Sequence, residues 1–239
     1  LQLVLGFNAL ETGIKMLPVS VTMLVASAAG SRLSARFSVR TLVRTGLITT
    51  VVAVFMLLAT VQPDLADAGF AISMAVLGVG MGLIVSQLGN VVQSSVDASG
   101  RGEAGGLQYT GQQLGSSLGV ALIGALVLSY LTSAFVSNIE DDPRISEQVQ
   151  SQVSVAAGTG IDFVAADQIA AAAQEAGLDE ATTTAIVDDY EQAQLQSLKA
   201  GLLAAALLAL VSLATTRDLP SGKPGGEAAE PQPAAAAAP

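Results

Sequence analysis

Hydrophobic residues in this chain are gathered into long stretches that short polar segments separate. The stretches cover residues 13–30, 45–61, 68–92, 106–136 and 195–215, the fourth being most apolar over residues 114–135. About 20 consecutive apolar residues span the hydrocarbon core of a bilayer as a helix. The pattern therefore predicts an all-α polytopic membrane protein with about five complete transmembrane helices. Residues 1–7 are interpreted as the end of a further, truncated helix, and residues 8–12 as a turn.

Basic residues occupy alternate connections between these stretches. Four arginines follow the first span, Arg101 lies in the link of residues 93–105, and Arg217 and Lys223 follow the last span. The four are Arg32, Arg36, Arg40 and Arg44. Short loops rich in Lys and Arg stay in the cytoplasm. We therefore expect a multi-pass protein of the cytoplasmic (plasma) membrane, with the C-terminus and the arginine loops in the cytoplasm.

The polar segment of residues 137–194 is expected on the opposite side, as an acidic, partly helical extracytoplasmic loop. Residues 162–176 are predicted to form one helix, with Asp162 able to cap its start and Gly177 to end it. Residues 179–197 are predicted to form a second helix that runs into the last span. The few aromatic residues argue against an independent globular domain, which favours a partly helical, solvated cap.

The predicted organisation has four parts. Residues 1–136 hold the truncated helix and four spans, residues 137–194 the external loop, residues 195–216 the last span, and residues 217–239 a disordered cytoplasmic tail. No charged region precedes the first apolar run, as a cleavable signal peptide would require. Because the chain opens inside an apolar run, it is interpreted as the C-terminal half of a longer protein.

Composition agrees with this interpretation and narrows the chemistry. The 239 residues are 51% hydrophobic and 13% charged, and the mean hydropathy is +0.58. The net charge of −10 arises in one segment, because twelve of the twenty acids lie between Glu140 and Glu191. No basic stripe with interleaved aromatics is present, so no nucleic-acid partner is expected. With no Cys and no His, and no catalytic constellation, we expect neither an enzyme nor a cofactor or metal site.

The connection from Gly30 to Arg40 resembles the cytoplasmic helix-connecting motif of the major facilitator superfamily. Gly30, Leu33, Arg36 and Arg40 stand at matching positions of that motif. Ala35 stands where the motif has an acid and Ser38 where it has a second Gly. Two interpretations of these arginines stay open. They set the topology and contact lipid phosphates, or they take part in cytoplasmic gating.

A second stretch resembles the fourteen-helix drug:proton antiporter branch of the same superfamily. It reads Arg-Gly-Glu-Ala-Gly-Gly from Arg101 and continues as Gln-Leu-Gly-Ser-Ser-Leu-Gly from Gln113. The turn before Pro18 supports the resemblance. The resemblance implies that this chain is the C-terminal part of such an exporter. The implied partners are the missing N-terminal half, membrane lipids, protons and a small amphipathic substrate.

Glycines in two spans recur at the spacing of one helix face. Gly111, Gly115 and Gly119 are four residues apart, as are Gly78 and Gly82. Ridges of small residues let membrane helices approach closely, so we expect helix packing at these positions. Such a ridge can also slide during a conformational change.

A few amides lie within the spans. Gln87 and Asn90, with Ser94, share a face of the third span, and Gln108 and Gln112 share a face of the fourth. They are candidates for a substrate path, and the alternative is hydrogen bonding between helices. No Asp or Glu lies near the middle of a complete span, so a proton-coupling acid is expected outside this segment.

Two functional hypotheses follow. The first is the C-terminal part of a secondary active transporter, which exports drugs or other amphipathic molecules by proton-coupled alternating access. The alternative is a non-transporting membrane scaffold whose acidic external loop binds a partner.

Overall fold

The computed structural model describes residues 6–60, 67–94, 96–97, 99–158 and 160–218. Within these ranges the chain is helical and contains no strand, which confirms the predicted all-α class. The predicted truncated helix lies largely outside the described residues, and so does the predicted disordered tail from residue 219 onward. The helices are α2 (Ala9–Leu33), α3 (Val39–Thr60), α4 (Asp67–Ser94), α5 (Arg101–Asp141), α6 (Glu147–Ala157), α7 (Ala166–Glu175) and α8 (Glu180–Thr215).

Five of these helices, α2, α3, α4, α5 and α8, are long and apolar enough to cross a membrane. Their ends differ from the hydropathy boundaries. Arg32 lies in the last turn of α2, whereas Arg40 and Arg44 lie inside α3. Of the four arginines expected in the connection after the first span, only Arg36 lies between the two helices. A helix does not stop where its residues become polar, because its backbone hydrogen bonds continue into water and Arg is a good helix former.

The start of α2 shows how local sequence sets a boundary. The Asn8 side chain accepts a hydrogen bond from the Glu11 backbone N–H at 2.9 Å, and the Glu11 carboxylate accepts one from the Asn8 N–H at 3.0 Å. This reciprocal capping box satisfies two N–H groups that the first helical turn leaves without partners. The segment expected to be a turn before the first span is therefore the capped first turn of the helix.

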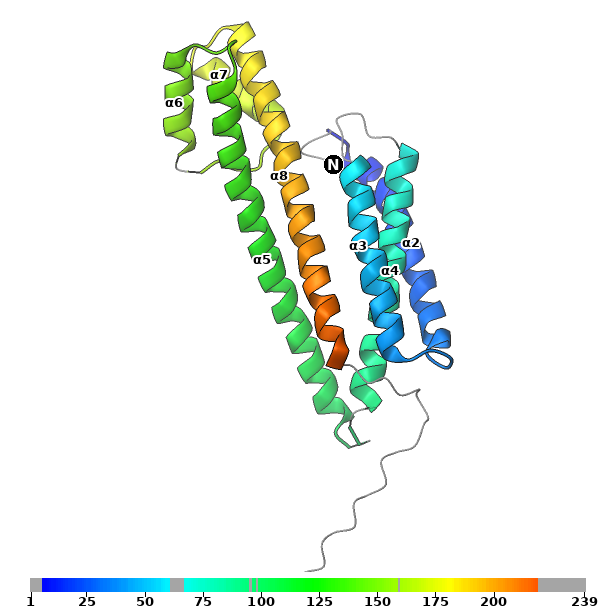
Figure 1. The fold of residues 1–239 in the computed structure, drawn as a ribbon. Helices are drawn as coiled ribbons and strands as arrows, with labels where there is room; N and C mark the ends of the chain where they lie inside the picture. The colour runs from blue at the N-terminus through cyan, green and yellow to red at the C-terminus, as the bar shows by residue number, and fades with distance from the viewer. Residues whose placement is uncertain (1–5, 61–66, 95, 98, 159, 219–239) are drawn as a thin grey trace, which may run out of the picture.

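Helix α4 packs along both α2 and α3, and its glycines make both approaches possible (Figure 1). Gly78 and Gly82 face α2: a Cβ on Gly82 would lie 2.5 Å from the Met23 carbonyl oxygen. Gly80, between them, faces the other way, where its Cβ would lie 2.8 Å from the Gly46 carbonyl oxygen of α3. Because none of these glycines has a side chain, three backbones stack at close range.

Helices α5 and α8 form a second antiparallel pair, and α8 also packs against α3 (Figure 1). Gly201 of α8 lies against α5, where a Cβ would meet the Val127 side chain at 2.6 Å. Helix α8 therefore joins the α5 side of the molecule to the α2–α3–α4 side.

Beyond the apolar band, residues 131–194 form a packed unit that we call the cap. It consists of the end of α5, α6, α7 and the first part of α8 (Figure 1). Its core contains Leu131, Phe135, Ile139, Ile145, Ala157, Ala185, Ile186, Tyr190 and Ala193. The rings of Phe135 and Tyr190 meet edge to face, with centroids 5.5 Å apart. Besides helices, the cap therefore contains a shared apolar core, which was not predicted.

Helix boundaries inside the cap also depart from the sequence-based expectation. Helix α6 was not anticipated, and α7 begins at Ala166 rather than near Asp162. The Asp162 backbone carbonyl instead accepts a hydrogen bond from the Tyr190 hydroxyl at 2.9 Å, which holds that segment extended against α8. Gly177, at φ 78°, follows α7 in the left-handed conformation that commonly ends a helix.

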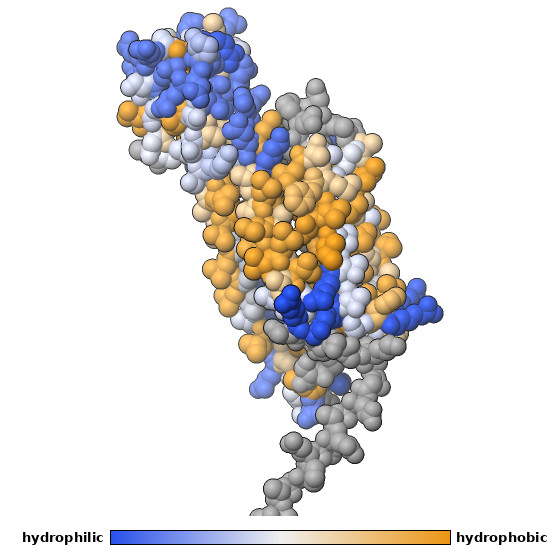
Figure 2. Space-filling model, viewed as in Figure 1, coloured by the Kyte–Doolittle hydropathy of each residue, from blue (hydrophilic) through white to orange (hydrophobic). Residues whose placement is uncertain are grey.

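Figure 2 shows an apolar band between the hydrophilic cap and a second hydrophilic region at the opposite end. Such a band, with polar surface above and below it, is the arrangement that a bilayer solvates.

Candidate functional site

The amide of Gln87 lies at the contact between α4 and α2. Its side chain is fully buried, and its Nε2 donates to the Gly30 carbonyl oxygen of α2 at 3.2 Å and to the Ser86 hydroxyl at 2.9 Å. Among the described residues its Oε1 has no hydrogen-bond partner. The geometry favours a bond between helices at this position. The side chains of Asn90 and Ser94 lie outside the part of the chain that can be described, so a path through them stays a prediction.

Gln108 and Gln112 lie one turn apart on one face of α5. Gln108 is half-buried and Gln112 is exposed. Nearby leucines on α5 are strongly exposed, Leu107 at 76% and Leu118 at 71%. A Cβ added to Gly111, Gly115 or Gly119 would meet nothing within 4 Å among the described residues. The structure thus brings Gln108 and Gln112 onto one glycine-rich face of α5 that is partly covered at Gln108 and open from Gly111 onward.

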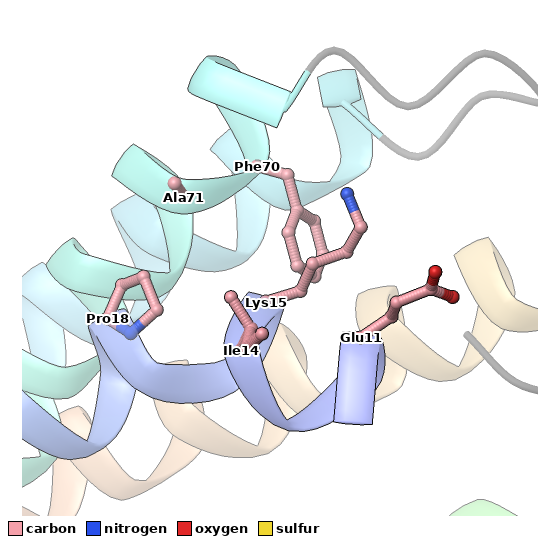
Figure 3. Close-up of a pocket in the computed structure, with 6 residues that line it drawn as sticks. All are labelled: Glu11, Ile14, Lys15, Pro18, Phe70 and Ala71. Atoms are coloured by element: carbon pink, nitrogen blue, oxygen red, sulfur yellow. The ribbon is translucent and has the colours of Figure 1, made fainter. Parts of the chain in front are cut away.

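A pocket lies between α2 and α4 at the end of the apolar band nearer the cap (Figure 3). Its volume is about 300 Å³, and its lining consists of Glu11, Ile14, Lys15, Pro18, Phe70 and Ala71. Figure 3 shows the charged ends of Glu11 and Lys15 extending from one side of α2, with the Phe70 ring beside Lys15. The pocket combines an apolar floor with two charges at its rim, which suits one end of an amphipathic molecule.

No pattern singled out in the sequence indicated this pocket. Pro18 lies inside α2, where it leaves the backbone without one N–H donor. The Thr22 hydroxyl donates to the Pro18 carbonyl oxygen at 2.7 Å, so the turn is partly held by a side chain. A proline in the first turns of a span, with an acid and a lysine four residues apart before it, is the signal that could have located the pocket.

The arginines gather at the opposite end of the molecule. Arg44 Nε donates to the Thr216 hydroxyl at 2.9 Å, and Arg40 Nη2 donates to the Arg217 carbonyl oxygen at 2.5 Å. Both bonds join the start of α3 to the end of α8, where cations are favoured by the helix dipole. Arg32 and Arg36 lie in and after the last turn of α2, and Arg101 begins α5. Whether they also gate a path stays a prediction.

The cap contains a small ion-pair network around Arg144. Its guanidinium contacts the Asp142 carboxylate at 2.7 Å and the Asp188 carboxylate at 2.8 Å. Hydrogen bonds from Arg144 hold the pKa of Asp142 below its ordinary value. This network ties the turn after α5 to α8.

Asp189 lies next to this network and behaves oppositely. It is buried, and one of its carboxylate oxygens has no partner among the described residues. Burial, followed by the charge of Asp142, raises the pKa of Asp189 to about 6. A carboxyl group whose pKa is raised in the folded state stabilises that state when protonated. The stabilisation from protonated Asp189 is complete below about pH 3.8 and is lost as the pH rises through about 6.

No group of three or more His, Cys, Asp or Glu able to hold a metal occurs among the residues described. The sites that can be described are therefore a largely open amide-bearing face, an amphipathic pocket and a basic end.

Comparisons with known proteins identify the family to which this chain is similar. The family model of the Major Facilitator Superfamily matches residues 1–139. The chain is 28% identical to the multidrug efflux pump LfrA of Mycolicibacterium smegmatis over 90% of its own length. It is 31% identical to the probable actinorhodin transporter of Streptomyces coelicolor over 59% of its length, and 28% identical to the tetracenomycin C resistance and export protein of Streptomyces glaucescens over 67%.

The chain spans 39%, 25% and 30% of the lengths of these three relatives, in that order. The alignment with LfrA covers 90% of the chain, so the parts left out at the two ends are too short to include the cap. The alignment therefore extends across the cap. No solved structure matches the chain significantly. Because the family model covers more than half of a chain with five helices able to cross a membrane, this multi-pass membrane protein belongs to the Major Facilitator Superfamily.

Proposed function

We propose that the chain is the C-terminal part of a proton-coupled exporter of amphipathic small molecules. The observation that carries this proposal is the largely open face of α5, where the half-buried Gln108 and the exposed Gln112 lie among open glycines and exposed leucines. An amide that faces hydrocarbon leaves donors unsatisfied, so this face belongs against protein or a water-filled path. The exporter names of the three relatives support the same conclusion.

Alternating access gives this face a role. Transporters of this fold have two halves that rock about a cavity near the middle of the bilayer. The glycine contacts of α4 with α2 and α3 hold those three helices close together, as one moving body requires. The α5 face then forms one wall of the cavity, and the N-terminal half forms the other. Within the described spans no carboxylate lies near mid-membrane, so the proton-carrying group belongs to that other half.

The proposal includes the orientation of the chain in the membrane. The arginine end, where α2, α3, α5 and the segment after α8 present their arginines, faces the cytoplasm together with the C-terminus. The cap and the pocket of Glu11 and Lys15 face outward, so a substrate would pass the α5 face before it reaches this pocket.

The test is efflux of ethidium from cells that express the complete open reading frame, with and without a protonophore. We expect protonophore-sensitive efflux that Gln108→Ala with Gln112→Ala reduces. Gln174→Ala, an exposed amide of the cap, is the matched control and leaves efflux unchanged. Equal efflux from the double variant and the control, at equal protein level, would contradict a substrate path along this face of α5. No efflux of any amphipathic substrate, with loss of a bound protein on deleting residues 137–194, would favour a scaffold.

A further inference from the structure

The cap contains a groove that the transport proposal does not use. It has a volume of about 520 Å³ and lies between α6 and α7, over side chains of α5 and α8. Phe135 and Ile186, both buried, form its floor together with Ala157 and Ala173. The walls include Val153 of α6 and Ile169 of α7. A space of this size and apolar character is within the usual range for small-molecule sites, about 300–1,000 Å³.

The groove follows from the side chains that face it. Helix α7 presents Ala172 and Ala173 to the groove, and α6 presents Ala156 and Ala157. Alanine is too short to fill the space between two helices that stand on a floor of larger residues. A closed core would place leucine or isoleucine there. The apolar walls are thus kept apart while Ala156 and Ala172 remain open to solvent.

The charges of the cap favour a positively charged ligand. Between Glu140 and Glu191 the chain has twelve acids and a single base, Arg144. That base is already engaged by Asp142 and Asp188. Asp162, which is exposed, lies in the lining of the groove itself, and Gln168 adds a polar group. Figure 2 shows the cap as mainly hydrophilic, with a few hydrophobic residues at its surface.

We infer that this groove binds one amphipathic organic monocation, with its apolar body between α6 and α7 and its charge toward Asp162. An apolar cavity on an acidic unit favours a lipophilic cation over a neutral molecule through charge, and over a small inorganic cation through buried apolar area. Such a site lies apart from the spans, so the inference goes beyond transport and holds or fails without it.

The experiment measures binding at equilibrium in lipid nanodiscs, with no pH gradient. An environment-sensitive fluorophore is attached to Gln174→Cys, an exposed position of α7 outside the groove lining, in a version of the protein that has no other cysteine. The probes are tetraphenylphosphonium and tetraphenylborate, which have nearly the same shape and opposite charge. We expect saturable binding of the cation and none of the anion. Asp162→Asn should weaken the cation by about twofold to fivefold, as an exposed charge pair allows.

Two filling variants locate the site. Ala172→Leu and Ala156→Leu add bulk at exposed positions on opposite walls, and each should weaken binding roughly tenfold. Ala171→Leu makes the same change on α7 at an exposed position that does not line the groove, and binding should be unchanged. Because the two variants lie on different helices, one of them still tests the site if the other disturbs the folding of the cap. Equal response to both ions, or equal affinity in all three variants, would overturn the inference, whereas absent efflux would bear only on the proposed function.

Discussion

The contact between α2 and α4 allows one sharp test of how this chain is held together. A Cβ on Gly82 would lie 2.5 Å from the Met23 carbonyl oxygen, 2.8 Å from the Ala26 Cβ and 3.0 Å from the Ser27 nitrogen. Two of these neighbours are backbone atoms, which cannot turn aside as a flexible side chain can. Gly82→Ala therefore has to push α2 away from α4.

The size of the effect follows from those distances. Ordinary van der Waals contact begins near 3.4 Å, so the 2.5 Å approach requires a displacement of about 0.9 Å. A gap of that size forfeits about a quarter to a half of the dispersion attraction along the contact. Overpacking of this kind costs about 1–3 kcal/mol. At about 2–4 °C per kcal/mol, the thermal midpoint should fall by about 2–12 °C.

The assay is the temperature at which the monodisperse peak is lost in fluorescence-detected size-exclusion chromatography. The matched control is Gly89→Ala on the same helix, where a Cβ would meet nothing within 4 Å among the described residues. Both substitutions gain the same helix propensity, about 1 kcal/mol, so the difference between them isolates the steric cost. Equal midpoints for the two variants would refute the close packing of α4 on α2.

Three further predictions concern polar groups. The protection factors of the cap amides, which are corrected for the intrinsic pH dependence of hydrogen exchange, should fall from pH 5 to pH 7, because the pKa of Asp189 is about 6 and its protonated form stabilises the fold; Asp189→Asn should leave the protection factors equal at the two pH values. Arg44→Ala breaks the 2.9 Å bond to the Thr216 hydroxyl and should lower thermal stability by about 0.5–1.5 kcal/mol; an unchanged thermal midpoint would show that the bond does not hold the end of α8. Gln87→Ala removes one of the two hydrogen bonds to the Gly30 carbonyl oxygen, which still accepts from the Ser34 N–H, and should lower thermal stability by about 0.5–1.5 kcal/mol without changing substrate KM. A changed KM would instead support a role of Gln87 in the substrate path.

Hydropathy located all five long helices, because the need for about 20 apolar residues leaves little ambiguity in the sequence. It could not locate their ends. The signal fades where residues become polar, yet α5 and α8 continue into the cap and α3 begins with Arg40 in its first turn. At those ends the boundary depends on caps such as the Asn8–Glu11 pair and on tertiary contacts, which periodicity does not register.

The candidate site was predictable only in part. Spacing grouped Gly78 with Gly82, both of which lie against α2, but it could not indicate that Gly80 lies against α3. It also grouped Gln87 with Asn90 without indicating that Gln87 donates to Gly30 across a helix contact. Which helix lies against a face is a property of the assembled bundle, and a single helical pattern carries no record of it.

The cap and the spans are stabilised by different physics, and this explains which features the sequence could reveal. Inside a bilayer, lipid is as apolar as leucine, so close packing of small residues brings helices together, and regular glycine spacing records this directly. In water, burial of apolar area is sufficient, so Phe135, Ile139, Ile186 and Tyr190 form a core although they are few and scattered along the chain. The scarcity of aromatics indicated only that the segment is not an independent globular domain; it did not reveal that α5 and α8 extend out of the membrane and supply seven of the nine core residues of the cap.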